Sequence, residues 1–149
     1  MAAKSVTHTG DKQAAASVHA VGERGGDLRG AAAKVRTIVR QAQEQRFDSA
    51  GFGRWPALKQ STIENKARTN SDRRPLRKTG ALYRSLTAAR ARGQVDDRKR
   101  DSLAFGTNLP YARFHQQGKG VPQRELESFP TRIDRELTRA MDEYVTTGR

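Results

Sequence analysis

The chain contains no cysteine and no long apolar run, and each absence excludes a class of protein. Without cysteine there is no disulfide framework, no thiol nucleophile and no thiolate metal site. No stretch approaches the roughly 18 apolar residues of a membrane span, so we expect no membrane partner. Residues 1–13 also lack the apolar core of a signal peptide, and we expect the protein to be made and kept in cytosol-like surroundings.

Large apolar side chains are scarce as well. Leu, Ile, Val and Phe fill 25 of the 149 positions, which is below the roughly 20% under which charged chains tend toward disorder. The length suits one domain, which we place at residues 18–149 after an extended N-terminal arm at residues 1–17. We expect a marginal monomer: either part of the chain is disordered when free, or neighbouring subunits supply the missing buried surface.

Positive charge is abundant and concentrated in the middle of the chain. Lys and Arg number 29 against 16 Asp and Glu, which gives a net charge of +13. Residues 54–100 hold 14 of these basic and 4 of these acidic residues. Such a segment fits a surface that faces DNA or an acidic protein, and it equally fits a solvated face. The candidate residues for that surface are Arg73, Arg74, Arg77, Lys78, Arg90, Arg92, Arg98, Lys99 and Arg100. Because aromatic residues that could stack on bases are sparse there, we expect no sequence-specific reading of bases.

Apolar residues at helical spacing predict a long helix near the start of the domain and another at its end. The first runs from Asp27, an N-cap residue, to about residue 46. The last begins at Thr131, the first residue of a capping pattern that ends at Asp134. The apolar face of this last helix holds Ile133, Leu137, Ala140, Met141, Tyr144 and Val145. We expect it to pack on the first helix or on the sheet.

Three shorter helices are predicted between them. Ser61 and Glu64 have the spacing of a capping box, which indicates a helix to about residue 68. A second short helix opens at residues 79–80. A third begins at Pro110 and ends at Gly118.

The remaining patterns indicate strands and loops. A hairpin is predicted with strands at residues 87–95 and 103–107 and a charged connection at 96–101, although residues 88–92 also fit a helix. Residues 17–22 are a weak strand candidate, and the aromatic residues in the loop 47–56 should fold back over a core. Together these elements predict an α/β (α+β) fold in which a small antiparallel sheet packs with a long N-terminal helix and a C-terminal helix.

Few residues suit catalysis or metal binding. His115 is the one histidine in a predicted ordered element, and no nucleophile or carboxylate at a catalytic spacing accompanies it, so we favour hydrogen bonding at a helix end or interface. Asp96, Asp97 and Asp101 could hold a divalent ion, but the basic residues between them compete for these carboxylates. We therefore expect no enzyme, no cofactor and no metal.

Several short motifs follow one another in the middle of the chain. They read W-P-x-L from Trp55, S-T-I from residue 61, P-L-R-x-T-G-x-L from residue 75, G-T at Gly106 and Y-A-x-x-H-x-x-G from Tyr111. In order and spacing, over residues 18–145, they resemble the phage virion morphogenesis (tail completion) proteins. The motif positions are Trp55, Leu58, Thr62, Lys66, Leu76, Thr79, Gly80, Leu82, Gly106, Thr107, Tyr111, Ala112, His115, Gly118, Pro122 and Arg124. One departure follows Gly118, where the family often has a second proline that residues 121–126 lack.

This resemblance implies a small α/β structural protein with no catalytic residue among the motif positions. It implies assembly into a homo-oligomeric ring, a hexamer or dodecamer, at the neck or the head-proximal end of a phage tail. The implied partners are adjacent neck, connector and tail-tube proteins and packaged DNA in the lumen. The implied location is the virion, reached from the host cytoplasm during assembly.

The motif residues also have a purely structural interpretation. Thr79 would cap a helix, and Gly106 and Gly118 would serve backbone turns. The expected core residues are Trp55, Leu58, Leu76, Leu82, Leu86, Tyr111 and Phe114.

Two other functions stay open at this point. One is a basic nucleic-acid-binding module that acts without ring assembly and whose affinity falls steeply with salt. The other is a hydrolase that uses His115. The sequence also does not separate a tail terminator from a head-side connector.

Overall fold

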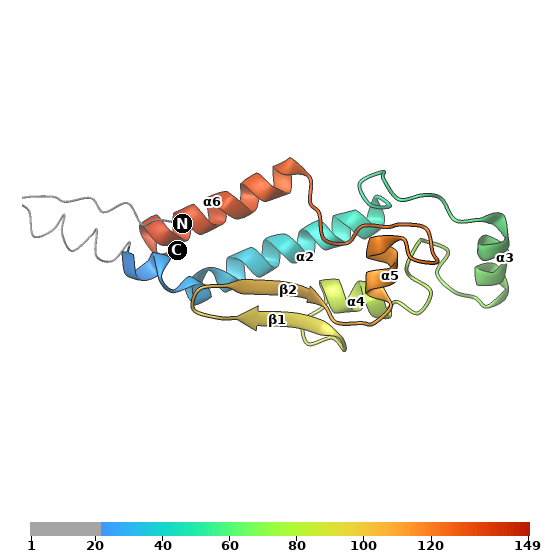
Figure 1. The fold of residues 1–149 in the computed structure, drawn as a ribbon, viewed down its shortest axis with the longest axis horizontal. Helices are drawn as coiled ribbons and strands as arrows, with labels where there is room; N and C mark the ends of the chain where they lie inside the picture. The colour runs from blue at the N-terminus through green and yellow to red at the C-terminus, as the bar shows by residue number, and fades with distance from the viewer. Residues whose placement is uncertain (1–21) are drawn as a thin grey trace, which may run out of the picture.

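One long helix, α2 (Ala32–Asp48), forms the spine of the molecule. The computed structural model describes residues 22–149, and Figure 1 shows the other elements arranged along this helix. A 3₁₀ turn, η1 (Leu28–Ala31), leads into it, and the Asp27 side chain accepts a hydrogen bond from the Arg29 backbone N–H at 3.2 Å. The predicted first helix and its N-terminal cap are therefore confirmed.

The C-terminal helix α6 (Thr131–Thr147) packs antiparallel along one side of α2 (Figure 1). Ile38 and Ala42 of α2 and Ile133 and Ala140 of α6 form one small core cluster. At the far end of α6, the Tyr144 hydroxyl donates to the backbone carbonyl of Asp27 at 2.9 Å. The predicted apolar face of the last helix is therefore confirmed as a contact with the first helix.

A two-stranded antiparallel hairpin lies on the other side of α2 (Figure 1). Its strands are β1 (Gln94–Arg98) and β2 (Leu103–Thr107), and Gln94 is paired with Thr107. The hairpin packs on α4 (Ala81–Thr87), where the Ser85 hydroxyl lies 2.9 Å from that of Thr107. The fold is mixed α+β, with helices around a small antiparallel sheet, as expected.

The first strand differs from the prediction. Thr87 ends α4, and the chain then turns through Arg90 and Gly93, whose φ angles of +58° and +82° belong to the left-handed region and interrupt an extended strand. The strand begins only at Gln94 and continues through residues 96–98, which the sequence pattern assigned to the connection. Asp96 is held in place there by Arg36 of α2, at 3.3 Å, and by Arg98.

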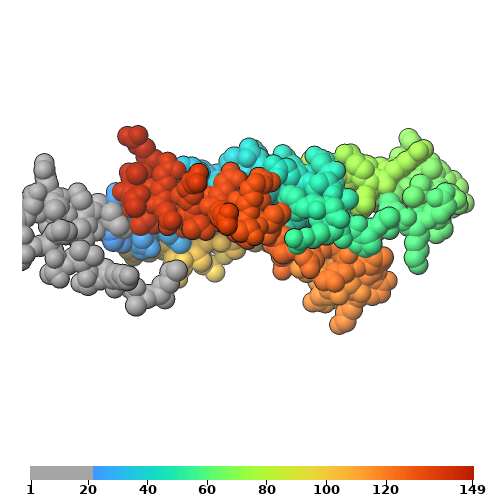
Figure 2. All heavy atoms as spheres, turned by 90° about the horizontal axis from the view of Figure 1, so that it is seen from above, coloured from blue at the N-terminus to red at the C-terminus, as the bar shows by residue number. Residues whose placement is uncertain are grey.

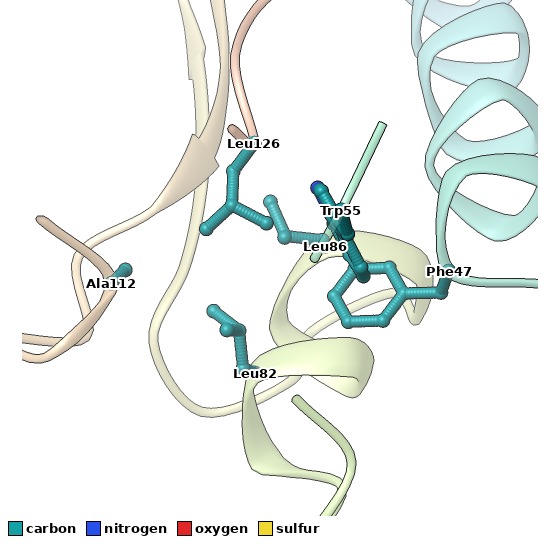
Figure 3. Packing of buried hydrophobic residues seen from close by; sticks show 6 residues of the cluster. All are labelled: Phe47, Trp55, Leu82, Leu86, Ala112 and Leu126. Atoms are coloured by element: carbon teal, nitrogen blue, oxygen red, sulfur yellow. The ribbon is translucent and has the colours of Figure 1, made fainter. Parts of the chain in front are cut away.

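The main core cluster lies at the C-terminal end of α2. It combines Phe47, Trp55, Leu82, Leu86, Ala112 and Leu126, which come from separate parts of the chain (Figure 3). Phe47 meets both Trp55 and Tyr83 edge to face, with ring centroids 5.3 Å apart in each case. The aromatic loop after α2 thus covers a core, as expected.

Two short helices complete the molecule. The helix α3 (Gln60–Arg68) forms one end of the long, narrow body, and α5 (Ala112–Gln117) lies in a segment that protrudes from its side in Figure 2. Gly118 ends α5 with φ +69°, and a Cβ there would lie 3.0 Å from the Gln123 Cβ, so the predicted role of this glycine is confirmed.

Several finer predictions are wrong. Ser61 and Thr131 lie inside α3 and α6 and cap neither helix, because each helix begins at or before that residue. Gly106 lies within β2 without a positive φ. Tyr111 and Phe114 are exposed, at 40% and 37%, because α5 turns only its Ala112 side toward the core.

Two predictions concern residues beyond the described part. The arm at residues 1–17 lies outside it, and of the strand candidate at 17–22 only Gly22 lies inside, where it is helical. The division into arm and domain therefore stays a prediction.

Candidate interaction groove

Most of the motif positions meet around one cavity of about 510 Å³ between α3, α4, α5 and the loop that follows α5. We call this cavity the motif groove. Its lining includes Leu58, Thr62, Lys66, Leu76, Thr79, Leu82, Tyr111, His115, Pro122 and Arg124, together with Lys59, Lys78 and Val121. These residues come from five separate segments, so the motif pattern along the sequence describes a single place in the fold.

Lys66 fastens the wall of the groove that follows α3. Its side chain is only 6% exposed, and its Nζ donates to the backbone carbonyls of Asp72 and Arg74, at 2.9 and 2.6 Å. Burial lowers the pKa of this ammonium group. Lys66 therefore shapes the loop between α3 and α4 while its charge stays out of water.

Arg124 fastens another part of the groove wall. It is 4% exposed, its Nη2 donates to the carbonyl of Pro56 at 2.9 Å, and its backbone N–H donates to the carbonyl of His115 at 2.8 Å. Burial lowers the pKa of this guanidinium group as well. The Pro122–Arg124 segment is thus tied both to α5 and to the loop that precedes α3, although it lacks the second proline of the family pattern.

His115 lies between these anchors without an acid–base partner. Within residues 22–149 its buried Nδ1 has no hydrogen-bond partner, and no Asp or Glu lines the groove. Burial, and after it the nearby Arg124 charge, lowers the pKa of the imidazole. Within the described residues the His115 side chain forms no hydrogen bond to a nucleophile or to an orienting carboxylate, and this geometry gives the hydrolase alternative no support.

The remaining motif residues hold the fold around the groove. Trp55 and Ala112 belong to the main core cluster, and the Trp55 Nε1 also donates to the carbonyl of Glu125 at 3.1 Å. The Thr79 hydroxyl accepts from the Ala81 N–H at 3.3 Å, next to Gly80 with φ +72°. Thr107 accepts from the Leu109 N–H at 3.2 Å.

Arg46 was not among the sequence-predicted site residues, yet it is one of the most buried side chains described. Its guanidinium donates to the backbone carbonyls of Leu126 and Ser128 and stacks on Phe129, 4.6 Å from the ring centroid. Burial lowers the pKa of Arg46 to about 10. The sequence feature that could have predicted this burial is the spacing of Arg46, four residues from Ala42 and eight from Ile38, which places it on the core face of α2.

The basic candidate residues do not form one surface. The loop after α3, which carries Arg73, Arg74 and Lys78, lies at the α3 end, whereas the hairpin turn lies at the other end of α2 (Figure 1). The Leu28 N–H donates to the carbonyl of Arg100 at 2.7 Å and so fixes that turn beside η1. Arg90 and Arg92 lie between these two places, in the turn from α4 to β1.

Several of these basic residues are engaged within the molecule. Arg77 is a correction to the set, because it is 7% exposed, pairs with Asp48 at 2.6 Å and stacks on Tyr83 at 4.0 Å. Arg74 pairs with Asp72 at 2.6 Å. Lys99 pairs with Asp97 at 3.3 Å. Arg73, Lys78, Arg90 and Arg92 are exposed and form no ion pair within the described residues.

Two acidic residues of the hairpin, Asp96 and Asp97, are engaged in ion pairs. Asp96 lies in β1 between Arg36 and Arg98, so it does not sit with Asp101 at a hairpin tip. No group of three metal-ligating side chains occurs in residues 22–149. In the same part of the chain, no helix has the length and apolar character to cross a membrane.

A second, larger cavity of about 970 Å³ lies beside β2, on the other side of α5 from the motif groove. We call it the β2 groove. Its lining includes Val35, Val39, Leu103, Ala104, Phe105, Leu109, Phe129 and Leu137. Backbone hydrogen bonds from Asn108 to Gly93 and from Lys99 to Ser102 show which opposite pairs of the hairpin are hydrogen-bonded to each other. Because hydrogen-bonded and non-hydrogen-bonded pairs alternate along an antiparallel ladder, the backbone N–H and C=O groups of Leu103, Phe105 and Thr107 point away from β1. They have no hydrogen-bond partner among the described residues.

The described residues form a small α+β scaffold with an open strand edge and two grooves, and they place no catalytic acid–base pair at His115. Such a scaffold is suited to binding other macromolecules. The sequence pattern of the phage virion morphogenesis family matches residues 11–144, which is most of the chain, and the protein therefore belongs to this family. It is a phage morphogenesis protein associated with the virion. No curated protein and no solved structure matches it.

Proposed function

We propose that this protein is a structural component of the neck or of the head-proximal end of a phage tail, where copies assemble into a ring. The ring, a hexamer or dodecamer, would complete or join the tail and contact adjacent neck, connector and tail-tube proteins. Membership in a morphogenesis family supports a structural role in the particle. The finer assignment of place and stoichiometry is part of the proposal.

The open β2 groove is the main observation that supports self-assembly. A second chain can pair with the free backbone groups of the strand edge and can also cover the adjoining apolar cavity, which is costly to leave in water. The two core clusters within one chain are small, which is consistent with further burial between chains. An elongated subunit whose contacts differ at its two ends suits a head-to-tail interface that closes into a ring.

The distribution of basic residues bears on the alternative of an independent nucleic-acid-binding module. Such a module acting as a monomer would be expected to gather its free cations on one track. Here Arg73 and Lys78, exposed and without an ion pair, lie at the α3 end, whereas Arg90 and Arg92 lie in the turn from α4 to β1. Copies arranged in a ring could still direct one of these groups toward DNA in a lumen.

The test is the mass of the protein in solution, measured by native mass spectrometry and sedimentation. Ala104→Arg adds a bulky side chain to the β2 groove, while the register places it opposite Asp97, which tolerates the charge. Ala89→Arg is the matched control, because Ala89 is exposed and lies in the turn after α4, away from both grooves. We expect a ring for the native chain and the control and smaller species for Ala104→Arg. A native chain that stays monomeric at particle-like concentrations would overturn the proposal.

A further inference from the structure

Two cations that line the motif groove are buried without a carboxylate partner. Lys66 and Arg124 form no ion pair within residues 22–149, and their described acceptors are backbone carbonyls. The Nε of Arg124 is buried with no acceptor, and the same is true of the Nδ1 of His115. A buried charge that lacks a counter-charge costs several kcal/mol, so this wall of the groove is suited to an incoming anion.

No nearby acid of the described chain fills this role. Asp72 is the carboxylate that acts on the pKa of Lys66, but Arg74 already donates hydrogen bonds to both of its oxygens. The lining of the groove contains no Asp and no Glu, while Lys59 and Lys78 add further positive charge. The electrostatic complement of the groove is therefore missing from the described part of the molecule.

Most of the remaining lining is apolar, apart from Thr62 and Thr79. Leu58, Leu76, Leu82, Val121 and Pro122 face the cavity together with Tyr111, which is 40% exposed. Exposed tyrosines beside buried cations are typical anchors of protein interfaces. A nucleic acid would need several stacking aromatics or a continuous track of free cations, whereas this lining offers one tyrosine ring, two largely immobilised cations and two exposed lysines. The chemistry therefore favours a polypeptide over a phosphate backbone.

We propose that the motif groove binds an acidic segment of a different protein, one that places an apolar side chain against Leu58, Leu76 and Tyr111 and a carboxylate beside Arg124 and His115. This inference goes beyond self-assembly, because the β2 groove lies on the other side of α5 and shares no lining residue with the motif groove. One subunit would thus contact its copies through β2 and a partner protein through the motif groove. The shared motif positions would then mark the partner site.

The experiment is a titration of the full-length, isotope-labelled protein with a blocked peptide that carries two Leu-Asp pairs, at about 0.15 M salt, followed by NMR. We expect saturable shifts in residues 111–124. Exchanging Asp for Asn in the peptide should lower the affinity about tenfold, and exchanging Leu for Ala should lower it by a similar factor.

Two exposed aromatic residues of α5 and its N-terminus provide matched variants. Tyr111→Ala should lower the affinity of the acidic peptide about tenfold, whereas Phe114→Ala, outside the groove and 37% exposed, should leave it within about twofold. Arg124→Gln would remove a structural anchor of the groove as well as a charge. The charge of the groove is therefore tested with Lys78→Ala, because Lys78 is an exposed residue of the lining. It should weaken binding while the spectrum of the free protein stays folded.

Each contrary outcome has a distinct meaning. Equal binding of the Asp and Asn peptides, or no saturable binding, would overturn the proposal. Oligothymidylate that shifts the groove residues in place of the peptide would show a nucleic-acid site. Loss of assembly in Tyr111→Ala would show that a second copy occupies the groove. None of these results depends on Ala104→Arg, so the proposed function and the partner site can fail separately.

Discussion

The two core clusters along α2 are packed in different ways. At its C-terminal end, Phe47 is enclosed by aromatic and aliphatic side chains from several segments, and Arg46 beside it ties the loop before α6 to the helix. Along its middle, four buried aliphatic side chains join α2 to α6. The first region positions the motif groove, so it must be rigid. The second holds one helix on another and leaves the β2 groove open, so it can adjust when chains associate.

The largest effect should come from the aromatic region. Phe47→Ala removes a ring that meets both Trp55 and Tyr83, and we expect a loss of about 3–5 kcal/mol of unfolding free energy. Thermal or urea denaturation followed by circular dichroism measures it. Phe114→Ala is the control, with an expected change below about 0.5 kcal/mol because that ring is exposed. Similar losses for both variants would contradict the packing difference.

The next effect concerns the buried guanidinium. Arg46→Met keeps much of the apolar stem but leaves the carbonyl of Ser128 without its donor and that of Leu126 with the Gln43 amide alone, and we expect a loss of about 2–3 kcal/mol. Arg46→Lys should recover less than half of it, since one ammonium group cannot reproduce the fork. Hydrogen exchange should show the loop 118–130 opening first. A variant as stable as the native chain would mean that Arg46 does not anchor this loop.

The smaller cluster predicts a smaller and more local effect. Ile133→Val should cost about 1 kcal/mol, and we expect it to increase amide exchange in α6 more than around Phe47. Exchange monitored by mass spectrometry distinguishes the two regions. Uniform acceleration throughout the chain would show instead that both clusters unfold as one unit.

The same contrast explains how far the sequence could predict the structure. Helical spacing predicted α2 and α6, because their apolar residues recur on one face, and Gly118 predicted the end of α5. The first strand was predicted at the wrong position. The turn between α4 and β1 depends on a left-handed conformation of Arg90, which no residue preference indicates.

The groove required tertiary information. Lys66 is far in the chain from His115 and Arg124, and only the fold brings the three together around a cavity. The charge of residues 54–100 looked like one surface because sequence proximity says nothing about which end of α2 each loop reaches. Arg77 and Arg46 are buried by cation–π and carbonyl contacts that composition does not reveal. Most positions of the family motif line the groove, but their order in the sequence did not indicate a cavity.

The smallest predicted effect is electrostatic and belongs to the loop that walls the motif groove. The hydrogen bond from Arg74 lowers the pKa of Asp72 from 3.8 to about 2. Because the folded state favours the carboxylate, its stabilising contribution is complete above the unfolded value and is lost as the pH falls from 3.8 toward about 2. Asp72→Asn should therefore flatten the decline of stability over this acid range, whereas Asp101→Asn, at a carboxylate that forms no ion pair in the described residues, should leave it unchanged. Acid denaturation curves measure both slopes, and NMR shifts near residue 66 should follow the Asp72 titration, since Lys66 bonds to the Asp72 carbonyl. Equal slopes for the native chain and Asp72→Asn would show that the loop is held by Lys66 alone.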